Sequence, residues 1–194
     1  MLAASPLVPV SFEDEPLICV DDADVVVGYR DKAACHRGTG ILHRAFSLFI
    51  FTPAGELIVQ QRSARKRLWP GFWANSCCSH PRRGETIAAA AERRLGEELG
   101  LTCVLTPLYT FTYQAQYDAD GAEHELCTVL VGCTSAVPQP HPHEVLALKT
   151  VAPRALDAAL HDAPHAYAPW LHLEWPTLRQ AHWSAVNRVV AAGA

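Results

Sequence analysis

Histidine, cysteine and glutamate residues of this 194-residue chain recur at spacings that suit metal binding and proton transfer. Glu123 and Glu125 are two residues apart in a β-rich segment, so both carboxylates should point to one side of a sheet. Cys78 and His80 repeat this spacing in another segment. Taken singly, these pairs also suit solvent-facing glutamates and an inert buried cysteine. Together they indicate a site that binds a metal ion and moves protons.

Two further histidines, His36 and His43, are seven residues apart in the stretch H-R-G-T-G-I-L-H. The glycines make this stretch a loop, and a loop can bring both imidazoles to one ion. Scattered surface histidines are the alternative explanation of such a spacing. Three histidines with two glutamates would suit Zn²⁺, Mn²⁺ or Fe²⁺ better than Ca²⁺, which prefers oxygen ligands alone.

Other charged residues could hold a diphosphate and its metal ion. The basic run R-S-A-R-K-R at 62–67 follows a predicted strand, where arginine and lysine can clamp phosphate groups. Lys32 could join them, and a solvated basic loop is the alternative. Glu97 and Glu98 end a predicted helix, where carboxylates oppose the helix dipole. A divalent cation would offset that cost, unless the pair is simply exposed and tolerated.

The elements that must position these residues are mostly strands. The pattern predicts strands over 17–20, 25–29, 44–52, 56–62, 109–117, 123–133 and 144–151, and a short extended segment over 73–79. The strands at 44–52 and 56–62 should form a hairpin around the turn P-A-G. Helices are expected for one turn at 31–36, from a Thr86 cap to Gly100, from Pro153, and in a last region interrupted by Pro176. This order predicts an α/β or α+β fold in which helices sandwich a mixed sheet.

Length and composition predict one domain over 16–194, preceded by a flexible extension over 1–15. A net charge of −4 gives no case for nucleic acid or an anionic membrane as partner. No apolar run approaches the length of a spanning helix, and the first residues resemble neither a secretory signal nor a transit peptide. The 7 cysteines are odd in number and contain no C-x-x-C pair, which favours reduced thiols in a cytoplasmic protein.

The motifs resemble a known family. The pattern S-x5-E-x7-R-R-L-x-E-E-x-G-L at 79–101 resembles a Nudix box. It departs from that box at Ser79, where the first glycine is usual, and at Arg94, where a metal-binding glutamate is usual. With W-P-G-F-W-A-N-S-C-C-S-H-P, E-H-E-L and Y-A-P-W, these departures are similar to one branch, the type 1 isopentenyl-diphosphate isomerases. The resemblance runs from about Asp31 to Trp170.

This resemblance implies a Nudix-type fold with extra C-terminal helices. It also implies an isomerase that converts isopentenyl diphosphate to dimethylallyl diphosphate through a tertiary carbocation, feeding isoprenoid biosynthesis. By position in the motifs, it implies Zn²⁺ or Mn²⁺ ligands at His36, His43, His80, Glu123 and Glu125, and Mg²⁺ at Glu98 with the Cys78 main chain. It implies diphosphate contacts at Lys32, Arg62 and Lys66. It also implies that Cys78 and Glu125 form the acid–base pair, and that Tyr113 and Trp170 are the active-site aromatics. Cys78 is preferred to Cys77 because of its spacing to His80.

Two other functions stay open from the sequence. A Nudix hydrolase of nucleoside diphosphates would need the glutamate that Arg94 replaces, and it would have no use for N-S-C-C-S-H-P. A non-catalytic metal-bound or protein-interaction module would have no need of both Cys78 and Glu125.

Overall fold

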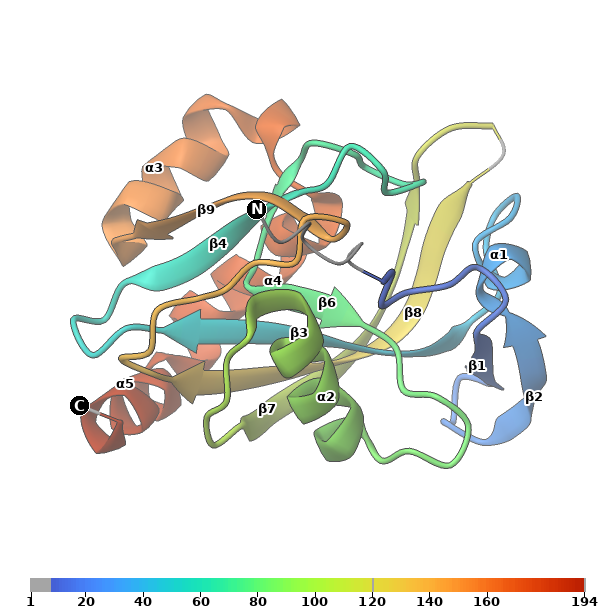
Figure 1. Ribbon diagram of the computed structural model, residues 1–194, viewed down its shortest axis with the longest axis horizontal. Coiled ribbons are helices and arrows are strands. Elements are labelled where there is room, and N and C mark those ends of the chain that lie inside the picture. Colours follow the sequence, from blue (N-terminus) through green and yellow to red (C-terminus); the bar gives the residue numbers. More distant parts are fainter. Residues whose placement is uncertain (1–7, 120, 194) are drawn as a thin grey trace, which may run out of the picture.

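The computed structural model describes residues 8–119 and 121–193, which form a nine-stranded sheet with helices against both of its faces (Figure 1). The strands are β1 (Pro16–Val20), β2 (Val26–Asp31), β3 (His43–Phe51), β4 (Leu57–Arg62), β5 (Trp73–Ala74), β6 (Cys77–Ser79), β7 (Thr106–Gln116), β8 (Ala122–Cys133) and β9 (Val145–Val151). The helices are α1 (Lys32–Cys35), α2 (Ile87–Leu99), α3 (Pro153–Asp162), the 3₁₀ turn η1 (Pro164–Ala166), α4 (Pro169–Thr177), the π turn η2 (Leu178–His182) and α5 (Trp183–Ala192). This arrangement confirms the predicted mixed sheet between helices.

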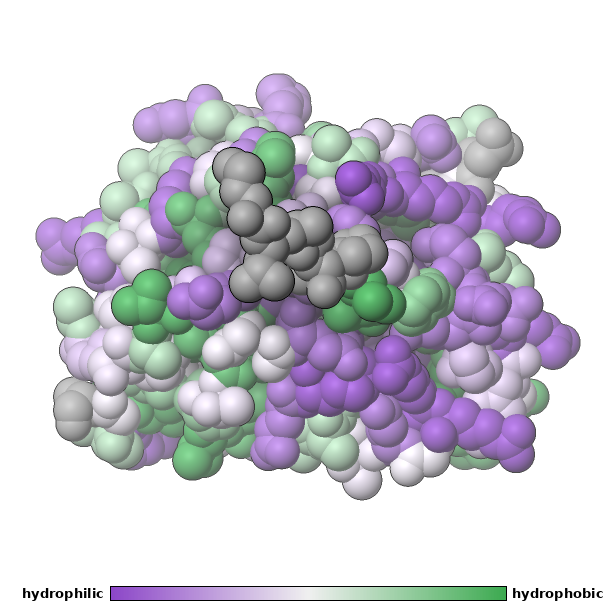
Figure 2. Space-filling model, viewed as in Figure 1, coloured by the Kyte–Doolittle hydropathy of each residue, from purple (hydrophilic) through white to green (hydrophobic). Residues whose placement is uncertain are grey.

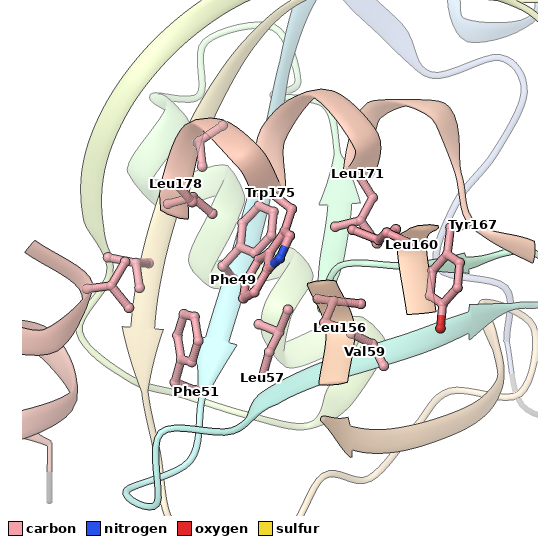
Figure 3. Close-up of a cluster of buried hydrophobic side chains, with 13 residues drawn as sticks. Phe49, Phe51, Leu57, Val59, Leu156, Leu160, Tyr167, Leu171, Trp175 and Leu178 are labelled. Carbon is pink, nitrogen blue, oxygen red and sulfur yellow. The ribbon is translucent and has the colours of Figure 1, made fainter. Parts of the chain in front are cut away.

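Strand β3 lies at the centre of the sheet, and its side chains alternate between two apolar layers. Phe46, Leu48 and Ile50 pack with α2, whereas Phe49 and Phe51 pack with α3, α4 and α5. Figure 3 shows the second layer, in which Phe49 and Trp175 lie between β3 and α4. Because both faces of β3 are covered, its sequence is a nearly continuous apolar run instead of an alternation.

Helix α2 begins and ends where the sequence predicts. The Thr86 side chain accepts a hydrogen bond from the Ala89 amide at 3.2 Å, and Gly100 closes the helix in the left-handed conformation, with φ of 62°. Its buried face, which includes Ala91 and Leu95, packs on β3 and β6. The helix therefore holds β6 against the sheet from one side.

The expected hairpin of β3 and β4 is wrong over most of its length. The two strands pair only where Phe51 meets Leu57 and then diverge, and β4 pairs instead with β5 and β9. Asn75 and Ser76 lie between the two diverging strands. Asn75 donates to the Leu48 carbonyl at 3.1 Å, and Ser76 donates to the Ile58 carbonyl at 2.6 Å. These side chains satisfy backbone groups that a continuous hairpin would have paired.

The C-terminal region also differs from expectation at Pro176. This residue lies inside α4 and does not interrupt it, and the π turn η2 follows directly before α5. Pro176 has no N–H to donate one turn back, so α4 continues past this residue with one backbone hydrogen bond fewer. Within the part of the chain that the structure describes, no helix is long and apolar enough to span a membrane.

The predicted flexible extension over 1–15 falls partly outside the described residues, which begin at residue 8. Residues 8–15 contact α1 and α2: the Lys32 amide donates to the Glu15 carbonyl at 2.9 Å, and the Arg94 side chain donates to the Val10 carbonyl at 2.7 Å. Figure 2, in the orientation of Figure 1, shows hydrophilic residues gathered over the link between β6 and α2. There Arg82 pairs with Glu15 at 2.6 Å.

Candidate active site

Five side chains predicted as metal ligands meet at one point. His36, His43, His80, Glu123 and Glu125 each offer one ligand atom, and these atoms all lie within 4.8 Å of one another. The sheet accounts for this meeting, because β3 lies between β6 and β8. His43 at the start of β3 is in register with Glu125 on parallel β8, and His80 directly follows β6. His36 joins the cluster from the end of α1.

Backbone carbonyls orient two of the imidazole rings. His36 Nδ1 lies 2.8 Å from the Lys32 carbonyl, and His43 Nδ1 lies 2.7 Å from the Ile41 carbonyl. Each Nδ1 therefore donates its proton to a carbonyl, and each Nε2 faces the cluster with a free electron pair, as in metal-ligating histidines. Both Nε2 atoms and Glu123 Oε2 are buried, and His36 Nε2 lies 2.7 Å from Glu123 Oε2, but among the described residues none of the three has a hydrogen bond of good geometry. Such converging orphan atoms fit a bound divalent cation.

Burial controls the protonation of this cluster. Burial, together with neighbouring His36, lowers the pKa of His43 to about 3, and burial lowers the pKa of His80 well below its ordinary value. Both imidazoles are therefore neutral near pH 7. Burial would raise the pKa of Glu123, but the charge that His36 carries when protonated, 2.7 Å away, lowers it to about 2. Neutral imidazoles beside a carboxylate are the donor set that Zn²⁺ and Mn²⁺ accept.

Glu125 differs from Glu123 in its partners. One carboxyl oxygen accepts from the Tyr113 hydroxyl at 2.8 Å, and the other lies 3.0 Å from His80 Nε2. Burial and the charge of Glu123 raise the pKa of Glu125 well above its ordinary value. Of the two glutamates, Glu125 is therefore the one suited to hold and release a proton.

Cys77 and Cys78 point to opposite faces of the sheet. Cys77 is fully buried in the apolar layer beneath α2, whereas Cys78 lines a cavity of about 280 Å³ that Glu125 also lines. The Cys78 thiol donates to Asn75 Oδ1 at 2.8 Å. Burial, with the charge of Glu174, raises the pKa of Cys78 well above that of a free thiol. Cys78 therefore stays protonated and can act as an acid.

Aromatic side chains form the apolar part of the cavity. Trp170, which is buried, donates from Nε1 to Asn75 Oδ1 at 3.0 Å, so the same amide orients both Trp170 and Cys78. Tyr113 is also buried and lines the cavity. Both predicted aromatics thus lie in the wall that holds Cys78 and Glu125.

Six basic side chains also line the cavity, together with Glu13 and Glu144. They are the predicted phosphate contacts Lys32, Arg62 and Lys66, with Arg65, Arg67 and Arg94. Arg62 is held by the Leu68 and Trp69 carbonyls at 2.8 and 3.1 Å, and its guanidinium lies 5.0 Å from the Trp170 ring centroid. Lys32 donates to the Ser11 hydroxyl at 2.6 Å, and Lys66 pairs with Glu144. A cavity with clustered cations and an apolar end suits a phosphorylated apolar molecule.

Glu98 does not join the five-residue cluster. It is buried, pairs with Arg94, and accepts weakly from Gln60 Nε2 at 3.4 Å. Arg93 pairs with Glu97 at 3.0 Å. The two arginines thus offset the unfavourable position of both carboxylates at the end of α2, so a cation is not needed to explain them. Mg²⁺ binding by Glu98 stays a prediction.

Three polar residues beside the site were missed in the sequence. Asn75 lies in the quoted motif, but nothing local marks it as the acceptor for Cys78 and Trp170. Ser47 lies 3.4 Å from Cys78 Sγ, and Glu174 is fully buried behind it. Glu174 follows Trp170 by four residues on α4, which places both on one helix face. That spacing was the available signal.

Comparison with known proteins agrees with this geometry. The model of the NUDIX domain matches residues 41–173. The isopentenyl-diphosphate Delta-isomerase of Nocardia farcinica is 46% identical over 157 residues, which cover 80% of this chain and 90% of that protein. Isopentenyl-diphosphate Delta-isomerase 1 of Photorhabdus laumondii is 40% identical over 171 residues, covering 87% and 97%.

Solved structures support the fold independently. A crystal structure of a Deinococcus radiodurans protein aligns with a TM-score of 0.69 at 22% identity, covering 87% of this chain and 99% of that one. A MutT protein from Methanosarcina mazei aligns with a TM-score of 0.60 at 16% identity, covering 72% and 94%. At these identities the likeness concerns the fold alone.

Proposed function

The chain belongs to the isopentenyl-diphosphate Delta-isomerase family of NUDIX-domain proteins and isomerises isopentenyl diphosphate to dimethylallyl diphosphate, and we propose that Cys78 and Glu125 carry the protons. The observation that supports this pair is their common cavity: both side chains reach it from strands on either side of β3, and several lysines and arginines line it as well.

The reaction moves a carbon–carbon double bond within one molecule. One proton is added at the terminal alkene carbon, and another is removed from the carbon on the far side of the cation. One enzyme group must therefore give a proton while the other accepts one. The raised pKa values of Cys78 and Glu125 favour the protonated form of each group, so each can hold a proton inside the cavity. The atoms balance with either residue as the first acid.

In this proposal, Trp170 stabilises the carbocation intermediate and Tyr113 supports Glu125. An aromatic face attracts a desolvated cation by about 2 kcal/mol, and Trp170 lines the cavity. The Tyr113 hydroxyl holds one oxygen of Glu125 in place. The buried walls exclude water, which would otherwise trap a carbocation as an alcohol.

Lys32, Arg62 and Lys66 bind the diphosphate in this proposal, because their charged groups line one cavity. Fixing that end positions the apolar end near Cys78 and Glu125. Residues 16–194 form the enzyme domain, and residues 8–15 supply part of the cavity wall through Ser11 and Glu13. The reducing cytoplasm suits this chemistry, because Cys78 must remain a thiol and all seven cysteines are free.

The five-residue cluster holds Zn²⁺ or Mn²⁺ in this proposal, with Mg²⁺ accompanying the diphosphate at Glu98. The charge of the first ion would tune the proton affinity of Glu125. Backbone carbonyls orient the imidazoles of His36 and His43, and Glu123 supplies an anionic oxygen. Arg94, which pairs with Glu98, replaces a glutamate that a Nudix hydrolase would use, and this disfavours hydrolysis.

The test is incubation with isopentenyl diphosphate and Mg²⁺, followed by detection of dimethylallyl diphosphate, with and without a chelator. Cys78→Ala and Glu125→Gln should each abolish turnover, whereas Cys77→Ser should retain it, because Cys77 faces α2 and not the cavity. A normal rate in Cys78→Ala would exclude the thiol as a proton carrier. If Glu125→Gln still incorporates deuterium from deuterated water into the product at the parent rate, Glu125 is excluded as a proton carrier.

A further inference from the structure

A second carboxyl group lies behind Cys78, on the side away from the cavity. Glu174 on α4 has no exposed surface and does not line the cavity, and Oε2 has no hydrogen-bond partner among the described residues. A buried carboxyl without an ion-pair partner is costly. The neighbouring buried positions of α4, Leu171 and Trp175, are apolar. A polar residue at this position therefore calls for a functional reason.

Glu174 is connected to Cys78 by a short row of polar atoms. The Cys127 thiol lies 3.6 Å from Glu174 Oε1 and 3.5 Å from Ser47 Oγ. Ser47 Oγ lies 3.4 Å from Cys78 Sγ. The sheet builds this row, because Ser47 on β3 is in register with Cys78 on β6, and β8 brings Cys127 to the other side.

The protonation state of Glu174 affects which atoms of this row donate hydrogen bonds. Burial raises the pKa of Glu174 to about 8, and the hydroxyl of Ser47 and the thiol of Cys127 only partly offset that effect. Near pH 7 the carboxyl is therefore mostly neutral, and its Oε1 accepts the hydrogen of the Cys127 thiol. Ser47 then has its own hydroxyl hydrogen available for the Cys78 sulfur, and the Cys78 thiol hydrogen is left to Asn75 Oδ1.

We propose that Glu174 is a positioning residue for the isomerase reaction, which acts through Cys127 and Ser47 to hold the sulfur of Cys78 in its catalytic orientation. Asn75 fixes Cys78 from one side, at 2.8 Å, and Ser47 with Glu174 fixes it from the other. A sulfur held on two sides has one position relative to the bound alkene, and a small misplacement of a catalytic group costs much of the rate. This inference rests on the proposed role of Cys78.

The experiment compares steady-state turnover of isopentenyl diphosphate in Ser47→Ala, Glu174→Leu and Glu174→Gln. Ser47→Ala and Glu174→Leu should each lower kcat about tenfold or more, with KM almost unchanged, because neither residue touches the substrate cavity. Glu174→Gln should restore most of kcat, because the amide keeps a donor and an acceptor. The double variant of Ser47→Ala and Glu174→Leu should have a kcat no lower than that of the slower single variant, since both residues act through one row of contacts.

Tyr109→Phe is the matched control. It removes a hydrogen bond of 3.2 Å to the Glu174 carbonyl but leaves the carboxyl group and Ser47 intact, so kcat should not change. Thermal unfolding of every variant separates a loss of orientation from a loss of fold. Full kcat in a folded Ser47→Ala and Glu174→Leu, with Cys78→Ala inactive, would overturn this inference alone. Turnover by Cys78→Ala would overturn the role of Cys78 and this inference with it.

Discussion

Arg94 pairs with Glu98 one turn further along α2, and both side chains are buried. Arg94 also lies 3.4 Å from Glu144 and donates to the Val10 carbonyl at 2.7 Å. At this position the ordinary Nudix box has a glutamate. Arginine in place of this glutamate therefore neutralises the acidic side chains at the end of α2. Its contacts also connect α2 to the N-terminal segment and to the loop before β9.

Arg94→Met should destabilise the fold by about 3–5 kcal/mol, because it leaves the carboxylate of Glu98 buried without its ion-pair partner. Urea denaturation measures the loss. Arg93→Met is the control: Arg93 is partly exposed, so its removal should cost only about 1 kcal/mol. Equal losses in the two variants would contradict the importance of burial here.

His43→Gln should weaken metal binding by at least about tenfold, because it removes one of five converging donors. Metal content after dialysis against a chelator, followed by titration with Zn²⁺ and Mn²⁺, measures this. His124→Gln provides the comparison, since His124 lies between the two glutamates but outside the cluster. An unchanged Zn²⁺ and Mn²⁺ affinity in His43→Gln would refute the cluster as the metal site.

Tyr113→Phe should lower kcat by about ten- to a hundredfold with little change in stability, because Glu125 loses its 2.8 Å hydrogen bond. Initial rates at saturating substrate measure the effect. Tyr109→Phe, on the same strand, should remain active because its hydroxyl contacts α4. A fully active Tyr113→Phe would show that Glu125 needs no such support.

Glu174 should make the stability depend on pH. Its pKa is about 8 in the folded protein and near 4.5 when exposed, so the folded state favours the protonated form. The stabilisation is complete below pH 4.5 and declines as pH rises through 8, by at most about 1.4 kcal/mol per pH unit. Urea denaturation between pH 5 and 9 should show a steeper decline in the parent than in Glu174→Gln. The same dependence of the unfolding free energy on pH in the parent and in Glu174→Gln would contradict a buried neutral carboxyl at this position.

The sequence was sufficient where local chemistry decides the structure. The Thr86 cap and Gly100 bound α2 as predicted, and alternation along β8 places Glu123 and Glu125 on one side. Five of the predicted metal donors meet because alternation and strand order act together. The chain of motifs also identified the family correctly.

Tertiary contacts decide the features that the sequence did not predict. Nothing in the turn at 53–55 reveals that Asn75 and Ser76 will separate β3 from β4. The burial of Glu174 depends on how α4 lies on the sheet, which a helix pattern alone does not specify. The carboxylates at the end of α2 suggested a cation, whereas neighbouring arginines neutralise them.

The parallel pairing of β3 with β8 has a consequence for how the protein folds. Ser47 and Cys127 touch although they are 80 residues apart in sequence. The donors His43 and Glu125 meet through the same pairing, so the cluster is complete only after this loop has closed. Long-range pairing of this kind slows folding, because loop-closure entropy is lost before contacts compensate for it. Metal capture should therefore come late in folding, and the rate at which refolding chains take up Zn²⁺ should follow the rate of β3–β8 assembly.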